Sequence, residues 1–304
     1  MEGITKTRKF PLLGDIVAML LLFVVTQLIV GLILNLCGVV APTVSPIEAG
    51  DAGNIDTYMR EQGLLGRYNA WVYLLMMTLP IVVMWLYIRY RAGKGFVRIR
   101  HSAAGLNPSV VLVGVLWLLS SQILLEPLLL LLPQKQDPAL GLGAWACFTA
   151  VVSAPILEEL LCRGLLFETL HKRWGRITSI LLASLFFGLI HFDLSTAIVA
   201  VVAGMIFGVL YLRTSSIFAT IIVHSINNAM AFTLINFERD KVPFSDMVGG
   251  GTTYYVLYGV AALIFVAASV EAYFRVLKPR RKSEKVVPPS AEVESQSDAE
   301  EKTD

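Results

Sequence analysis

Hydrophobic residues run through this chain of 304 residues in long blocks that short polar segments separate. Each block is close to the roughly 20 residues that an α-helix needs to cross the hydrocarbon core of a bilayer. None of the blocks shows the alternation over about 10 residues that is typical of a strand in an outer-membrane barrel. The pattern predicts an all-α polytopic membrane protein with about eight transmembrane helices. The expected spans are residues 16–41, 69–88, 108–132, 141–170, 178–192, 196–212, 216–236 and 254–276.

The composition agrees with a membrane protein and excludes several other classes. Hydrophobic residues make up 56% of the chain and charged residues only 16%, whereas a soluble domain carries roughly 25% charged residues. The three cysteines all lie in apolar stretches, which excludes a secreted disulfide scaffold. A formal net charge of +2 provides no broad basic face, so no nucleic-acid partner is expected.

The placement of lysine and arginine predicts the orientation of the spans, because cytoplasmic loops of membrane proteins carry an excess of these residues. With the N-terminus in the cytoplasm, 18 of the 25 lysines and arginines fall in cytoplasmic segments and 5 on the opposite side. Both termini are therefore expected in the cytoplasm. Basic residues also precede the first span, as in a signal peptide, but its apolar stretch exceeds the usual length of roughly 7–15 residues and favours an uncleaved anchor.

Strongly polar residues inside the spans are the candidates for function, since a charged or polar group deep in hydrocarbon costs several kcal/mol unless it is paired. Seven of the eight such residues fall between positions 158 and 228, which is the main functional signal in the sequence. The eight residues are Glu126, Glu158, Glu159, Arg163, His191, His224, Asn227 and Asn228.

Helical spacing separates the two adjacent glutamates. Glu159 and Arg163 are four residues apart, so they share a helix face and can form an ion pair. Glu158 is rotated by about 100° from Glu159 and has no partner on its own helix. We therefore interpret Glu159 as a structural residue and Glu158 as the carboxylate that is available for chemistry.

The polar groups of three separate spans lie at a similar depth. At about 1.5 Å per residue, Glu158 and His191 are roughly 21 and 22 Å from the basic cytoplasmic ends of their spans. His224 and Asn228 are roughly 16 and 22 Å from theirs. Unrelated packing residues have no reason to share one level, so the depths favour a single site inside the membrane.

A carboxylate with a histidine is the minimum set for activating water, and further histidine and amide donors can stabilise an oxyanion in acyl transfer. A metal site is the alternative, since two histidines and a carboxylate suit zinc. No His-Glu-x-x-His motif is present, and the residues alone leave both alternatives open.

Three motifs on successive spans resemble those of the CPBP intramembrane proteases, a family that comprises the type II CAAX prenyl endopeptidases and the bacterial Abi proteins. The resemblance covers roughly residues 140–235 and depends on all three motifs occurring in this order. The motifs are Glu158-Glu159-x-x-x-Arg163, Phe187-x-x-x-His191 and His224-x-x-x-Asn228.

The resemblance implies hydrolysis of a peptide bond in a membrane-associated protein or peptide. Glu158 and His191 would activate the water, and His224 and Asn228 would stabilise the oxyanion. Glu126, which precedes Pro127 in the third span, has no place in the motifs. For Glu126 we prefer a role in packing or in compensating the proline kink to a role in catalysis.

The same resemblance implies that Glu159 and Arg163 hold the site in shape. It does not require a bound metal, so no cofactor is expected. If a divalent metal such as zinc does bind, its ligands are Glu158, His191 and His224. The expected location is the bacterial inner (plasma) membrane, with the lipid bilayer and a membrane-associated protein or peptide as partners.

Five segments follow from these expectations, and the last is marked by a shift to Ser, Glu, Lys and Pro that is typical of disorder. They are a cytoplasmic segment over 1–15, N-terminal transmembrane helices over 16–139, a catalytic core over 140–237, an outside loop with the last transmembrane helix over 238–278, and a disordered cytoplasmic tail over 279–304.

Two other functions compete with proteolysis. A non-catalytic immunity or membrane scaffold protein of the Abi type would keep the motifs without using them, and its phenotype would survive Glu158→Gln. A transporter would use the buried carboxylates as a proton relay, but transporters show paired helix interruptions in their two halves, and none is evident here.

Overall fold

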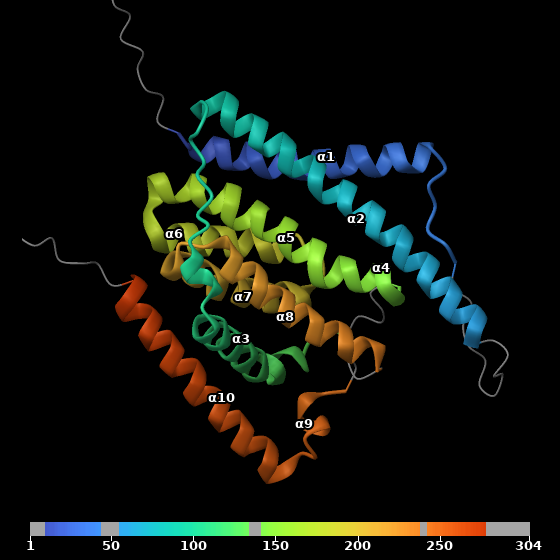
Figure 1. Ribbon diagram of the computed structural model, residues 1–304, viewed down its shortest axis with the longest axis vertical. Coiled ribbons are helices and arrows are strands. Elements are labelled where there is room, and N and C mark those ends of the chain that lie inside the picture. Colours follow the sequence, from blue (N-terminus) through green and yellow to red (C-terminus); the bar gives the residue numbers. More distant parts are fainter. Residues whose placement is uncertain (1–9, 44–54, 134–140, 238–241, 278–304) are drawn as a thin grey trace, which may run out of the picture.

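Apolar helices form the described part of the chain, which comprises residues 10–43, 55–133, 141–237 and 242–277 of a computed structural model (Figure 1). No strand occurs in these ranges, so the predicted all-α class is confirmed. The predicted tail over 279–304 and most of the segment over 1–15 lie outside them. The α-helices are α1 (Leu13–Leu36), α2 (Ile55–Ala92), α3 (Pro108–Leu129), α4 (Gly143–Phe148), α5 (Ala154–Glu159), α6 (Glu168–Leu189), α7 (Leu194–Thr214), α8 (Ile217–Asn236), α9 (Phe244–Met247) and α10 (Gly251–Ala272).

Seven helical stretches in the described residues are long and apolar enough to cross a membrane. The longest, Gly143–Leu189, contains a break at Gly175, where φ is +76° and ψ is −170°. The guanidinium carbon of Arg163 lies 5.1 Å from the ring centre of Phe187, although 24 residues of straight helix would separate them by about 36 Å. The chain therefore folds back at Gly175, and this stretch contains two of the predicted spans, 141–170 and 178–192.

The second span belongs to a helix much longer than its apolar block. The prediction began this span at residue 69, whereas α2 begins at Ile55 and runs to Ala92. Hydropathy marks only the part of a helix that faces lipid, and nothing in residues 55–68 interrupts the helical hydrogen bonds. The close approach of Gly66 to Leu142 shows that this extension packs on the start of α4.

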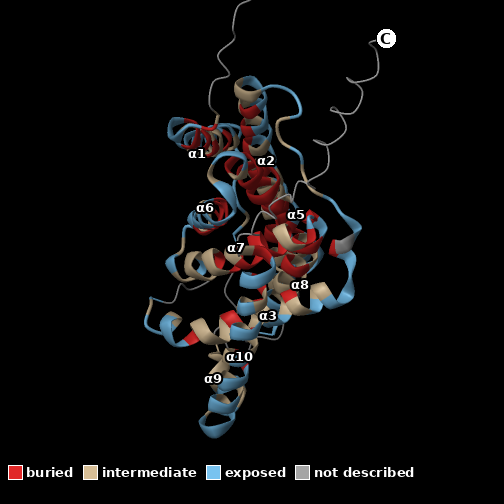
Figure 2. Cartoon of the chain, turned by 90° about the vertical axis from the view of Figure 1, so that its left-hand side faces the viewer, coloured by how far each residue is buried: buried red, intermediate tan, exposed pale blue. Residues whose placement is uncertain are grey.

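Buried residues concentrate in the segment Leu160–Phe167 that follows α5 and in the parts of α6 and α7 that pack together, whereas α1 and α10 are largely exposed (Figure 2). The peripheral helices expose large apolar side chains. Leu28 in α1 and Leu263 in α10 are 68% and 73% exposed. Such exposure is expected for side chains that face lipid. The buried centre of the molecule therefore coincides with the region that carries the polar motifs.

Small residues allow α7 to approach α6 closely. A Cβ atom on Gly204 would lie 3.0 Å from the Cα atom of Ser184, and one on Gly208 would lie 3.2 Å from Ile180. These glycines form the Gly-x-x-x-Gly pattern that permits close helix contact in membranes. The contact brings the backbone of α7 within reach of the polar residues that follow α5.

Candidate active site

The helix that carries the two glutamates is irregular on both sides of them. Two π-helical segments, Thr149–Ser153 and Leu160–Phe167, flank the six residues of α5. In the first, the N–H of Ala154 donates to the carbonyl of Thr149, five residues earlier. Pro155 follows directly and has no N–H to donate, so the wider turn adjusts the helix to the proline.

Glu159 and Arg163 form a buried ion pair at the centre of the bundle. Arg163 Nη1 donates to Glu159 Oε1 at 2.7 Å, and the two side chains are 1% and 0% exposed. Arg163 Nη2 donates to the carbonyl of Gly204 at 2.8 Å. The guanidinium also lies about 5 Å from the ring centres of Phe187 and Phe207. Arg163 therefore connects its own helix to α6 and α7.

His224 of α8 lies between the two glutamates. Its Nδ1 is 3.3 Å from Glu159 Oε1, and its Nε2 is 3.7 Å from Glu158 Oε2. The imidazole stacks on Phe207 with ring centres 5.0 Å apart. Because the carboxylate of Glu159 only accepts hydrogen bonds and is paired with an arginine, Nδ1 carries a proton and donates a hydrogen bond to this carboxylate. Nε2 faces Glu158.

Glu158 has a second partner that the sequence analysis missed. The hydroxyl of Tyr73 in α2 donates to Glu158 Oε1 at 2.7 Å. The depth of Tyr73 in its span could have indicated this contact, because Tyr73 lies 16 residues before the basic residue Arg89, or roughly 24 Å along the helix. That is close to the depth of Glu158, but tyrosine was not among the polar residues considered.

His191 lies in the turn after α6, because the helix ends at Leu189. The prediction placed it inside the span 178–192. The helix stops earlier because Phe192 adopts a left-handed conformation with φ +55° and Asp193 caps α7. His191 Nδ1 lies 2.7 Å from the carbonyl oxygen of Phe187, and its ring packs edge-on against that phenylalanine.

Phe187 connects His191 to the rest of the cluster. Its ring centre is 5.0 Å from that of His191 and 5.7 Å from that of His224. Within the described part of the chain, His191 has no hydrogen bond or ion pair with Glu158. The structure therefore brings Glu158 and His224 face to face, and the ring of Phe187 packs edge-on against both His191 and His224.

Asn228 takes part in a chain of amides one helical turn beyond His224. Its Nδ2 donates to the carbonyl of Ala150 at 2.9 Å. Asn227 Nδ2 donates to Asn228 Oδ1 at 3.3 Å, and Asn227 Oδ1 accepts from Gln122 of α3 at 2.6 Å. Gln122 was also missed by the sequence analysis. Asn228 thus contacts the helix of Glu158 about two turns before that glutamate.

The candidate metal ligands do not form a ligand group. Glu158, His191 and His224 are all in the described residues, where no group of three or more His, Cys, Asp or Glu side chains is arranged to hold a metal ion. The Nδ1 atoms of the two histidines have protein partners, Phe187 and Glu159, so their Nε2 atoms are the ring nitrogens that remain for other contacts.

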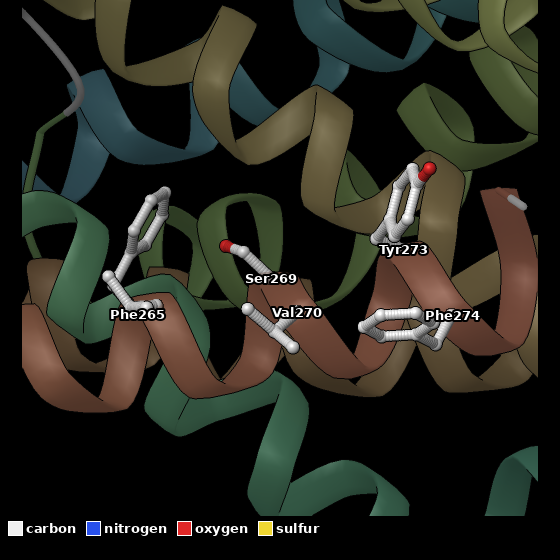
Figure 3. Close-up of a pocket in the computed structure, with 6 residues that line it drawn as sticks. Phe265, Ser269, Val270, Tyr273 and Phe274 are labelled. Atoms are coloured by element: carbon white, nitrogen blue, oxygen red, sulfur yellow. The ribbon is translucent and has the colours of Figure 1, made fainter.

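Two further features lie apart from this cluster. Glu126 accepts a hydrogen bond from the backbone N–H of Ser245 at 3.0 Å, which ties α3 to the start of α9. A hollow of about 270 Å³ lies between Phe265 and Phe274 and is lined by residues of α10 and of the π-helical segment Tyr273–Leu277 that follows it (Figure 3). None of the motif residues lines this hollow.

A comparison with protein families identifies the class of this bundle. Residues 140–230 match the family described as Type II CAAX prenyl endopeptidase Rce1-like. Neither the curated proteins nor the solved structures provide a match to the chain. The chain is an integral membrane protein whose residues 140–230 are similar to this endopeptidase family, and the predicted resemblance to the CPBP proteases is confirmed over that range. All the motif residues lie in the matched range, whereas Tyr73 and Gln122 lie outside it.

Proposed function

We propose that the protein is an intramembrane endopeptidase that hydrolyses a peptide bond in a membrane-associated protein or peptide of the bacterial inner membrane. The observation that carries this proposal is the buried carboxylate of Glu158, held by Tyr73 and facing the imidazole of His224. The family match over residues 140–230 supports the same reaction class.

In the proposed reaction, Glu158 acts as the general base and removes a proton from the attacking water. The free Nε2 of His191 orients that water. The water oxygen bonds to the carbonyl carbon, and the resulting oxyanion accepts hydrogen bonds from the amide N–H of Asn228 and from His224 Nε2, which must carry a proton for this role. The C–N bond then breaks, and Glu158 returns its proton to the leaving amine.

Glu159 and Arg163 support the reaction without touching the substrate. Glu159 holds His224 through Nδ1, which keeps Nε2 directed at the reacting atoms. Arg163 compensates the buried charge of Glu159 and fixes it to α7. In this proposal the protein's own groups carry every proton transfer, so we expect the purified protein to remain active in the presence of a metal chelator.

The test compares the N-termini of membrane proteins in cells that carry wild type and Glu158→Gln at equal abundance. We expect new termini in wild type alone, and their positions identify the substrate and the cut site. Glu271→Gln serves as the matched control, because this glutamate pairs with Arg213 at the surface of the bundle and should leave cleavage intact. Identical termini with both folded proteins would reject the proposal and favour a scaffold or immunity function.

A further inference from the structure

Tyr73 reaches the site from a helix that lies outside the matched family region. It belongs to α2, and its hydroxyl contacts the carboxylate that we propose as the general base. We infer that Tyr73 is a positioning residue that fixes the orientation of the Glu158 carboxylate. This inference rests on the proposed function and adds a residue to its machinery.

The two oxygens of Glu158 have different surroundings. Oε1 accepts the short hydrogen bond from Tyr73, and Oε2 faces His224 Nε2 at 3.7 Å. Rotation about the last bond of a glutamate side chain is soft, so packing alone does not select one orientation. Glu158 is only 8% exposed, and solvent cannot hold it either. The hydroxyl therefore determines which oxygen is presented to the reacting water.

Tyrosine suits this role because its hydroxyl is neutral and its ring is stiff. A hydrogen bond from a neutral hydroxyl to a carboxylate is short and roughly twice as strong as one between neutral groups. It leaves Glu158 without a permanent ion pair, in contrast to Glu159 with Arg163. The carboxylate can therefore take up and release a proton while its orientation is kept.

The packing of α2 explains how the hydroxyl is held in place. Gly66 allows α2 to touch the start of α4, where an added Cβ would lie 2.8 Å from the carbonyl oxygen of Leu142. One turn further, the rings of Trp71 and Trp145 lie 6.1 Å apart. These contacts fix the register of α2 against the helix of Glu158, so the position of the Tyr73 hydroxyl is set by the fold.

The experiment measures cleavage of a peptide that spans the cut site, with purified full-length protein in detergent. Tyr73→Phe should lower kcat by about 10-fold to 100-fold, because the Glu158 carboxylate would no longer be held in the reactive orientation. KM should stay within about twofold of the wild-type value. Tyr87→Phe is the matched control. Tyr87 lies on the same helix, and its hydroxyl donates to another buried carboxylate, that of Asp15, also at 2.7 Å. Tyr87→Phe should leave kcat unchanged.

A variant that keeps a donor separates positioning from packing. Placing 4-aminophenylalanine at position 73 retains an N–H donor at the end of the ring and should restore kcat to within about threefold of wild type. If this residue does not restore the lost rate, the effect of Tyr73→Phe is one of packing, and the inference is wrong.

Infrared spectroscopy gives a readout that needs no substrate. The carboxylate band that disappears in Glu158→Gln should shift in Tyr73→Phe and keep its position in Tyr87→Phe. An unshifted band, or an unchanged kcat in folded Tyr73→Phe, would overturn the inference while Glu158→Gln remains inactive. If Glu158→Gln itself still cleaves the peptide, the proposed function fails first and the role of Tyr73 fails with it.

Discussion

At the residue scale, the buried ion pair of Glu159 and Arg163 makes the cluster sensitive to the loss of one charge. Arg163 is the largest side chain by volume that the described part of the chain buries completely. Removing it leaves the carboxylate of Glu159, whose side chain is 0% exposed, without its cation. The loss of one partner from such a pair is far more costly than the net value of the pair.

Arg163→Met should therefore lower the free energy of unfolding by about 3–5 kcal/mol. Equilibrium unfolding in mixed micelles measures the effect. Arg275→Met is the matched control, since Arg275 also pairs with a glutamate four residues away but is 67% exposed. It should cost less than about 1 kcal/mol. An equal decrease in the free energy of unfolding in the two variants would show that burial of the ion pair does not determine the effect of removing its arginine.

The sequence was sufficient to distinguish the two glutamates but not to find all their partners. A spacing of four residues predicts a pair on one helix, and Glu159 lies next to Arg163. Contacts between helices have no such spacing rule. The hydroxyl of Tyr73 and the amide of Gln122 reach the site from α2 and α3, so only the packing of the bundle shows them.

At the scale of elements, the contact between α6 and α7 positions the backbone that Arg163 binds. Gly204 supplies both parts of this arrangement. Its missing side chain admits Ser184, and its carbonyl accepts the hydrogen bond from Arg163. A larger residue would push α7 away from α6 and from the guanidinium at the same time.

We expect Gly204→Ala to lower the free energy of unfolding by about 1–3 kcal/mol, because the added methyl group meets the backbone of α6. Gly259→Ala in α10 is the control, since no atom lies within 4 Å of the Cβ that it adds. Alanine has the higher helix propensity, so this control should be neutral or slightly stabilising. A neutral Gly204→Ala would mean that the two helices can separate without cost.

Hydropathy predicted the helices well where they face lipid and poorly elsewhere. The spans expected at 196–212 and 216–236 agree with α7 and α8 to within a few residues. The π-helical segments around α5 leave no trace in the apolar pattern, because they change hydrogen bonding rather than composition. The sequence prediction missed the extension of α2 and the end of α6 before His191. Hydropathy reports which residues contact lipid, whereas these two helix ends are set by backbone hydrogen bonding.

At the scale of the whole molecule, several basic residues lie together at one end of the bundle. The charge pattern predicts that these residues face the cytoplasm. Arg213 binds Glu271 near the end of α10, and Arg176 donates to the carbonyl of Val276. Lys172 lies over the ring of Phe96, 3.9 Å from its centre. These contacts join the turn at Gly175 to the end of α10 and to the segment after α2.

The positions of the termini depend on how often the chain crosses the membrane. Length and composition give seven candidate spans in the described residues, and an odd number of crossings places the termini on opposite sides. The reversal at Gly175 divides the longest of these stretches into two crossings. The total becomes even, and both termini should then lie on the same side, which the excess of basic residues predicts to be the cytoplasm.

Reporter fusions in a bacterial host test this topology directly. Green fluorescent protein fused before Met1 or after Asp304 should fluoresce, and alkaline phosphatase at either position should be inactive. Alkaline phosphatase inserted between α8 and α9 should be active, because α8 ends at Asn236, one helix length away from the predicted cytoplasmic end of α7 at Arg213. Activity of alkaline phosphatase after Asp304, with fluorescence retained at Met1, would mean an odd number of crossings. Such a result would overturn the even count and would mean that one of the eight expected crossings does not span the membrane.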